Sequence, residues 1–213
     1  MAVQPAVFVV DDDSGVRDFI RVLLEFAGFG NVRTYESSRR FLEEAAFRDG
    51  DCVLLDLRMP EQDGLEVQRE LNRRAKRLGV IMITGHAEVP IAVKAMQAGA
   101  VDFIEKPFSN DALIASVHRA LAVNQASTDP AKSEDVRRRV STLTAREREV
   151  FDRIIQGWPN KTVAHDLQIS QRTVEMHRAR IMSKMQAQNL AVLIRMAIDA
   201  GMSLAPGRPS PNS

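Results

Sequence analysis

The 213-residue chain lacks several features that mark specialised classes of protein. Its single cysteine, Cys52, lies in the apolar run CVLL, so an internal disulfide is excluded and a buried, unreactive thiol is expected. No apolar run approaches the roughly 20 residues that span a bilayer, and the first residues lack the pattern of a secretory signal. There are no internal repeats. These absences predict a cytoplasmic protein with no membrane partner.

The chain also lacks an overall excess of either charge, with 29 Lys and Arg against 28 Asp and Glu. This balance conceals an asymmetry, because residues 1–124 contain 15 basic and 19 acidic residues. Residues 125–213 contain 14 basic and 9 acidic residues. An acidic half joined to a basic half indicates that only the second half meets a polyanion.

The first half of the chain alternates between short apolar runs and amphipathic helical patterns. Strands are expected at Ala6–Val10, Val32–Tyr35, Cys52–Leu55, Val80–Thr84 and Val101–Ile104. A helical pattern follows each of them. Five strands alternating with five helices predict an α/β domain at residues 1–124. We expect a doubly wound five-stranded parallel sheet in the order 2-1-3-4-5, covered on both faces.

The second half has a different organisation. Residues 125–141 are polar and contain Pro130, which predicts a linker whose later part has a helical pattern. Residues 142–205 have the pattern of four short helices and predict a second, all-α domain. The first of these helices opens with Thr144 and Glu147 at capping-box spacing. Residues 206–213 are rich in Pro, Gly and Ser and are predicted to be disordered.

Carboxylates are concentrated at the ends of two expected strands. The stretch VFVVDDDSG places three aspartates after the first strand, and Asp56 follows the third. Ligands bind beyond the carboxyl ends of these strands, where the chain direction reverses between strands 1 and 3. Clustered carboxylates repel one another unless a cation compensates them, and all-oxygen ligands favour Mg²⁺. The residues alone leave open whether Asp11 and Asp12, or Asp12 and Asp13, contribute.

The other expected strands end in residues that suit a phosphoryl group. Thr84 ends the fourth strand, and Lys106 follows the fifth. A cation and a hydroxyl near a carboxylate can neutralise and orient phosphoryl oxygens. An aspartate can act as the nucleophile and form an acyl phosphate.

Four segments carry a family resemblance over about residues 5–122. VVDDDS, LLDLRMPEQDG, ITGHAE and FIEKPF, in this order, resemble the defining segments of the receiver domain of two-component response regulators. The resemblance implies that Asp56 is the phospho-acceptor. It implies that Mg²⁺ is held by Asp11, Asp12, Asp56 and the backbone carbonyl of Arg58.

The same resemblance assigns further roles around Asp56. Thr84 would be the switch hydroxyl, Lys106 the phosphate-contacting lysine and Phe103 the switch aromatic. Asp13 would then be a helix cap or a solvent-facing residue. Phe103 also fits a fixed place in the core, and both interpretations stay open.

Two amphipathic helices joined by a short turn outline a helix-turn-helix in the basic half. NKTVAHDL would be the supporting helix, and QRTVEMHRARIMSKM, capped by Ser170, the recognition helix. Its apolar stripe contains Val174, Ile181 and Met185, so the opposite face is available to DNA. The candidates for base contacts are Arg172, Glu175, Met176, Ala179 and Ser183. The candidates for phosphate contacts are Asn160, Lys161, Thr173, Arg180 and Lys184.

The stretch Leu143–Gly201 resembles the LuxR-type DNA-binding domain of the NarL/FixJ subfamily. Pro159 stands where this subfamily usually has Ser or Thr, so Asn160 is expected to cap the supporting helix instead. Glu175 is unusual on a surface that faces phosphates. It can accept a hydrogen bond from the cytosine amino group, or form an intrahelical pair with Arg172 or Arg178. Both interpretations stay open.

Together the two resemblances imply a phosphorylation-controlled transcriptional regulator. A sensor histidine kinase would phosphorylate Asp56, and the chain would form a homodimer through a surface at residues 91–101. The dimer would bind double-stranded promoter DNA, with RNA polymerase as a further partner. Receivers generally catalyse their own phosphorylation and dephosphorylation, but they are not conventional turnover enzymes.

Two other functions compete with this interpretation. An aspartyl-phosphate hydrolase would need a second carboxylate after Asp56, and DLRMP offers none at the next two positions. A phosphorylation-independent DNA-binding protein would use the receiver only as a dimerisation scaffold.

Overall fold

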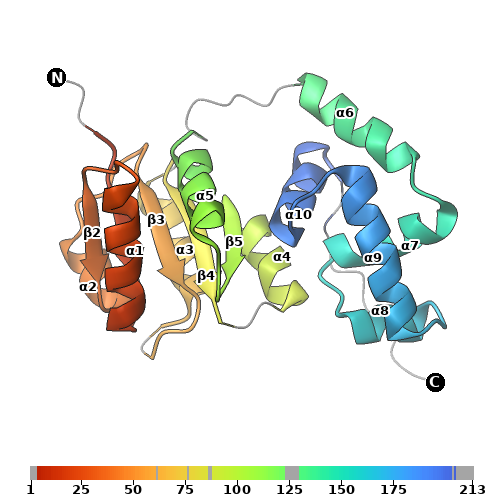
Figure 1. Ribbon diagram of the computed structural model, residues 1–213, viewed down its shortest axis with the longest axis horizontal. Helices are drawn as coiled ribbons and strands as arrows, with labels where there is room; N and C mark the ends of the chain where they lie inside the picture. Colours follow the sequence, from red (N-terminus) through yellow and green to blue (C-terminus); the bar gives the residue numbers. More distant parts are fainter. Residues whose placement is uncertain are drawn as a thin grey trace. The chain divides into compact units, whose positions relative to one another are not determined.

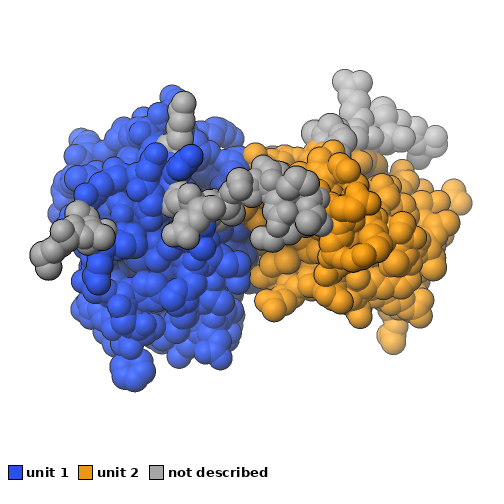
Figure 2. Space-filling view, turned by 90° about the horizontal axis from the view of Figure 1, so that it is seen from above, with its two compact units in different colours: residues 1–87, 98–126 blue, residues 88–97, 127–213 orange. Residues whose placement is uncertain are grey.

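The computed structural model divides into two compact units. It describes residues 4–60, 62–75, 77–85, 88–122, 130–202 and 204. The first unit comprises residues 1–87 and 98–126, and the second comprises residues 88–97 and 127–213 (Figure 2). Helix α4 (Val89–Gln97) thus groups with the second unit, although it lies between two strands of the first in sequence. No helix in the described ranges is both long and apolar enough to cross a bilayer.

The first unit is built on a five-stranded parallel sheet (Figure 1). Its strands are β1 (Val7–Val10), β2 (Val32–Tyr35), β3 (Cys52–Asp56), β4 (Gly79–Thr84) and β5 (Asp102–Glu105). The strand order is β2-β1-β3-β4-β5, and every neighbouring pair is parallel. The doubly wound fold and its strand order are therefore confirmed. Each strand lies within one residue of its expected bounds at either end.

Helices cover both faces of this sheet. They are α1 (Ser14–Phe26), α2 (Ser38–Glu44), α3 (Gly64–Arg74) and α5 (Asn110–Ala122). Because side chains alternate along a strand, Val7 and Val9 share a core cluster with Ile20 of α1 and Leu113 of α5. The Phe8 ring points to the other face, with its centroid 5.5 Å from that of Phe41 on α2. The near-continuous apolar strands are thus explained by burial on both faces.

The second unit contains a helical core. Besides α4, its helices are α6 (Pro130–Ser141), α7 (Ala145–Ile155), α8 (Asn160–Asp166), α9 (Gln171–Met185) and α10 (Leu190–Asp199). The last four correspond to the four predicted helices. The α7 capping box is present, since Thr144 N–H donates to Glu147 Oε2 at 2.8 Å and Glu147 N–H donates to Thr144 Oγ1 at 3.3 Å.

Helix α6 covers the later part of the predicted linker and packs into this core. Val136 and Val140 are buried in the same apolar cluster as residues of α7, α9 and α10. Arg139 donates from Nη1 to the carbonyl of Met185, the last residue of α9, at 2.9 Å. The first linker residues, 125–129, and the tail predicted to be disordered, 206–213, lie outside the described residues. The domain limits stay a prediction.

Candidate functional site

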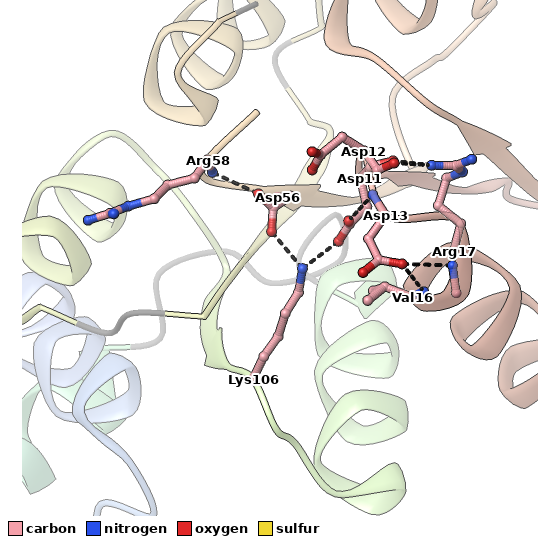
Figure 3. Close-up of polar contacts among 9 residues, drawn as sticks. Asp11, Asp12, Asp13, Val16, Arg17, Asp56, Arg58 and Lys106 are labelled. Carbon is pink, nitrogen blue, oxygen red and sulfur yellow. Dashed lines mark hydrogen bonds and ion pairs between the residues drawn. The ribbon is translucent and has the colours of Figure 1, made fainter. Parts of the chain in front are cut away.

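The carboxyl edge of the first unit's sheet brings together two carboxylates and one ammonium. Asp11 follows β1 and Asp56 ends β3, and these strands are neighbours. The Nζ atom of Lys106, just after β5, donates to Asp11 Oδ2 at 2.6 Å and to Asp56 Oδ1 at 2.7 Å (Figure 3). The sheet topology thus brings together three groups that lie 45 or more residues apart in the sequence.

Backbone amides complete the contacts of both carboxylates. The N–H of Asp13 donates to Asp11 Oδ1 at 3.0 Å, and the N–H of Arg58 donates to Asp56 Oδ2 at 2.7 Å. Each buried carboxylate therefore accepts one charge-assisted bond and one backbone bond. This satisfies polar atoms whose burial would otherwise be costly.

Burial and the ammonium have opposite effects on Asp56. Burial raises the pKa of the Asp56 carboxyl above its usual range, and the hydrogen bond from Lys106 only partly offsets this effect. Burial alone would lower the pKa of Lys106. Its hydrogen bonds to Asp11 and Asp56 outweigh that effect, so the Lys106 pKa is raised. The lysine therefore stays charged between the two carboxyl groups.

The remaining two aspartates of the triplet have separate roles. Asp13 caps α1, because its Oδ1 accepts from the N–H groups of Gly15 at 2.8 Å and Val16 at 3.2 Å. Asp12 is exposed, and Figure 3 draws no contact between its carboxylate and Lys106. Of the triplet, only Asp11 joins Asp56 in this arrangement.

This arrangement bears on the predicted Mg²⁺ site. Among the described residues, no group of three or more His, Cys, Asp or Glu side chains is placed to hold a metal ion. Two carboxylates and the Arg58 backbone are nevertheless oxygen donors of the kind that Mg²⁺ prefers. The donor chemistry fits, but a full carboxylate set requires Asp12 to move closer to Asp11 and Asp56. Asp12 therefore stays a predicted ligand.

Thr84 and Phe103 lie on the two strands nearest Lys106. Thr84 is buried at the end of β4, and its carbonyl accepts from the Lys106 N–H at 2.7 Å. Phe103 is buried on β5, opposite Met82 of β4. The ring is already inside the protein, so this conformation matches a fixed place in the core.

The second unit contains the predicted helix-turn-helix. Ser170 caps α9, since its Oγ accepts from the Thr173 N–H at 3.0 Å. Val174, Ile181 and Met185 are buried, so the opposite side of α9 faces outward. The exposed residues on α9 include Arg172, Glu175, Met176, Ala179, Arg180 and Ser183.

The candidates for phosphate contacts divide into two groups. Lys161 and Arg180 are exposed. Thr173, by contrast, is half-buried, and its hydroxyl lies 2.8 Å from that of Ser170. Lys184 turns back to α7, where its Nζ donates to Glu147 Oε2 at 2.6 Å.

Asn160 is the first residue of α8 and not its cap. The cap position is Pro159, which makes no side-chain capping bond, so the expectation for Asn160 is wrong. Its Oδ1 instead accepts from Arg178 Nη1 at 2.8 Å, which ties α8 to α9. Burial lowers the pKa of the Arg178 guanidinium.

Comparison with known proteins agrees with both units. Residues 7–118 match the family described as "Response regulator receiver domain", and residues 141–197 match "Bacterial regulatory proteins, luxR family". The chain belongs to the NarL/FixJ subfamily of response regulators. This response regulator is therefore a transcriptional regulator of a two-component system, and it is not a conventional enzyme.

Relatives match almost the whole chain of this response regulator. "Transcriptional regulatory protein FixJ" of Azorhizobium caulinodans is 45% identical over 201 residues, covering 93% of this chain and 94% of that protein. The protein of the same name from Rhizobium meliloti is 44% identical over 198 residues, covering 92% and 96%. A crystal structure of full-length FixJ from B. japonicum covers 94% of this chain and 98% of its own, at 39% identity and a TM-score of 0.52.

Two residues that support the acidic pocket of this response regulator were not predicted from the sequence. A Cβ on Gly64 would lie 2.6 Å from the Asp56 carbonyl oxygen and 2.9 Å from the Leu57 Cα, so only glycine lets α3 begin there. Its position directly after the α3 cap, Asp63, was a readable signal. Arg17 donates from Nη1 to the carbonyls of Asp11 at 2.7 Å and Asp12 at 2.9 Å, and no local pattern indicated this.

Proposed function

We propose that this response regulator accepts a phosphoryl group on Asp56 from a sensor histidine kinase and then binds promoter DNA as a homodimer. The observation that carries the proposal is the Lys106 ammonium bridging Asp11 and Asp56. Two buried carboxylates held by one cation form a polar cluster at the sheet edge where this fold binds ligands. Because the proposed partner is promoter DNA, we expect the protein to act in the cytoplasm.

The transfer is a nucleophilic substitution at phosphorus. One Asp56 carboxylate oxygen forms the new O–P bond, while the P–N bond to the donor histidine breaks and its electron pair stays on nitrogen. Lys106 offsets charge on the phosphoryl oxygens, and the Arg58 N–H orients the second carboxylate oxygen. The Thr84 hydroxyl, at the end of β4, hydrogen-bonds a phosphoryl oxygen in the phosphorylated state.

Receiver domains generally bind Mg²⁺ at this acidic pocket. We assign its ligands to Asp11, Asp12, Asp56 and the Arg58 carbonyl. Bound there, Mg²⁺ would supply positive charge to the phosphoryl oxygens. Asp12 must move closer to Asp11 and Asp56 for this role, and its exposure leaves its carboxylate room to do so.

The exposed face of α1 supports a protein partner next to this pocket. Phe19, Val22 and Phe26 are large apolar residues at helical spacing on this face, and Phe26 is 91% exposed. The Phe19 ring contacts that of Phe108, two residues beyond Lys106, with centroids 6.3 Å apart. An exposed apolar stripe of this kind is typical of a protein interface. We assign it to the kinase, the partner that must approach Asp56.

The DNA contacts follow from the exposed side of α9. A recognition helix lies in the major groove, and a dimer places two such helices about 34 Å apart. We assign base contacts to Arg172, Glu175, Met176 and Ala179, and phosphate contacts to Lys161 and Arg180. The bonds already made by Asn160, Thr173 and Lys184 favour structural roles for these three residues. RNA polymerase as a partner stays an expectation.

Mass spectrometry tests the phosphorylation step. The intact protein is incubated with acetyl phosphate and Mg²⁺, and we expect an adduct with the mass of one phosphoryl group. Asp56→Asn should show no adduct, whereas Asp18→Asn, a change of an exposed aspartate on α1, should be labelled like the wild type. An adduct that persists in Asp56→Asn, or its absence in the wild type, would contradict the assignment.

DNA binding with and without beryllofluoride separates the proposal from a phosphorylation-independent regulator. The protein is mixed with genomic DNA fragments, and its solution mass is measured in both states. We expect beryllofluoride to raise both the DNA affinity and the dimer fraction. Equal affinity and an unchanged monomer mass would favour the receiver as a passive scaffold.

A further inference from the structure

Glu175 is an exposed carboxylate on the side of α9 that faces outward. In an α-helix, positions 175, 176 and 179 lie on neighbouring parts of one surface, away from the buried stripe of Val174 and Ile181. Its neighbours on this surface, Met176 and Ala179, are also exposed. A negative charge here approaches phosphates when the helix enters a groove, so it opposes general DNA binding. Its presence calls for a compensating contact.

The intrahelical alternative for Glu175 is not formed. Within the described part of the chain, Glu175 forms no hydrogen bond or ion pair with Arg172 or with Arg178. The guanidinium of Arg178 is directed to Asn160 Oδ1 at 2.8 Å, and it is partly buried. Arg178 acts on Glu175 only by longer-range electrostatic attraction. The carboxylate therefore projects outward with its acceptor atoms available.

The chemistry of the carboxylate limits what it can recognise. An ionised glutamate only accepts hydrogen bonds, and it is repelled by base atoms that are themselves acceptors. In the major groove, guanine presents two acceptors and thymine presents an acceptor and a methyl group. Cytosine presents an amino donor without an acceptor on the same edge. Beside such a contact the apolar side chains of Met176 and Ala179 would exclude water, which would raise the cost of a mismatched base.

We propose that Glu175 is a specificity-determining residue that selects cytosine at one position in each half-site. This inference rests on the proposed DNA-binding function of α9 and deepens it. The same carboxylate weakens binding to all other sequences, because it repels phosphates wherever no amino group compensates it. Glu175 therefore lowers the affinity for DNA in general and increases the difference in affinity between sites with and without the cytosine.

Selection from a random pool of double-stranded DNA tests this assignment. Full-length wild type, Glu175→Gln and Glu175→Ala are each activated with beryllofluoride and Mg²⁺, and the bound sequences are determined. Glu149→Gln, an equivalent change on α7, is the matched control. We expect the wild type and the control to enrich the same cytosine. Glu175→Gln should favour adenine there, because glutamine pairs with the adenine N6 and N7 atoms.

Affinity measurements on the selected site give the size of the effect. Replacing the cytosine pair should weaken wild-type binding about 10- to 100-fold. The same replacement should have little effect on Glu175→Ala, which should also bind random DNA more tightly than the wild type does. If the wild type selects no sequence, the proposed function itself fails. If it selects a site but both Glu175 variants retain the cytosine, or if the Glu175-dependent base is not cytosine, the inference is overturned.

Discussion

Glu147 joins the α7 capping box to the recognition helix, so its charge should stabilise the second unit. The side chain is buried, accepts from the Thr144 N–H, and forms an ion pair with Lys184 of α9. The hydrogen bond from Lys184 is the main cause that lowers the Glu147 pKa, from 4.5 to about 2, and the Thr144 backbone bond adds to it. We predict that Glu147→Gln, which keeps the capping acceptor but removes the charge, destabilises this unit.

The magnitude follows from the lowered pKa. A fall from 4.5 to about 2 corresponds to roughly 3 kcal/mol of stabilisation by the charged form. The Lys184 side chain is 35% exposed, and solvent screening reduces the figure to about 2 kcal/mol. Because the folded pKa is lowered, the contribution is complete above pH 4.5. It is lost as the pH falls from 4.5 toward about 2, where the carboxylate is protonated.

Tryptophan fluorescence provides the assay in the full-length chain. Trp158 is the only tryptophan, and it packs against the core of the second unit, so its emission reports unfolding of that unit alone. Urea unfolding at pH 7 should show the loss of about 2 kcal/mol, and the difference between wild type and variant should shrink below pH 4.5. Glu149→Gln removes an exposed pair on the same helix and should cost less than about 0.5 kcal/mol. Equal unfolding midpoints for wild type and Glu147→Gln at pH 7, or a difference independent of acid pH, would refute the reasoning.

Three further changes test the first unit. Gly64→Ala should slow labelling of Asp56 by acetyl phosphate about 10- to 100-fold, since the added methyl displaces the Asp56 backbone. The control is Gly85→Ala, whose added methyl has no atom within 4 Å, and it should be labelled at the wild-type rate. Equal labelling rates for the two variants would contradict this account. Lys106→Met should raise the pKa of Asp56 further, so the pH profile of labelling should move to higher pH, and an unmoved profile would count against the bridging role. Asp102→Asn removes the charge from a buried carboxylate. This carboxylate accepts a hydrogen bond from the Ser116 hydroxyl at 2.5 Å and forms an ion pair with Arg119 of α5. We expect the substitution to lower the unfolding free energy of this unit by about 3 kcal/mol, measured by urea unfolding followed by circular dichroism, and a loss below about 1 kcal/mol would be contrary to this role.

The sheet was predictable because its sequence signals are local. Each strand is a short apolar run that ends at a polar or turn residue, and parallel strands bring their carboxyl ends to one edge. The meeting of Asp56 with Asp11 and Lys106 follows from that topology alone. The direction of Asp12 does not, because three consecutive aspartates have the same chemistry and only the local backbone separates their directions. The resemblance assigned Asp12 to the pocket, and this conformation leaves it exposed.

Contacts between distant segments explain what the sequence did not reveal in the second unit. Helical periodicity placed Lys184 on the flank of the recognition helix, where a phosphate contact was reasonable. Its partner Glu147 lies 37 residues earlier, and no local pattern joins the two. Arg178 and Asn160 are similarly 18 residues apart. The helical pattern of α6 was predicted, but its packing into the core was not, because only Val136 and Val140, four residues apart, mark its apolar side within a charged run.

The packing of α6 determines where the C-terminal half can be cut. A fragment that starts at residue 141 would remove two valines from the core and expose the apolar surface that they cover. It would also strip the arginine partner from the carbonyl that ends the recognition helix. Such a fragment would be prone to self-association for reasons unrelated to DNA or phosphate. Cleavage before Pro130 preserves these contacts and gives the more faithful reference for the isolated half.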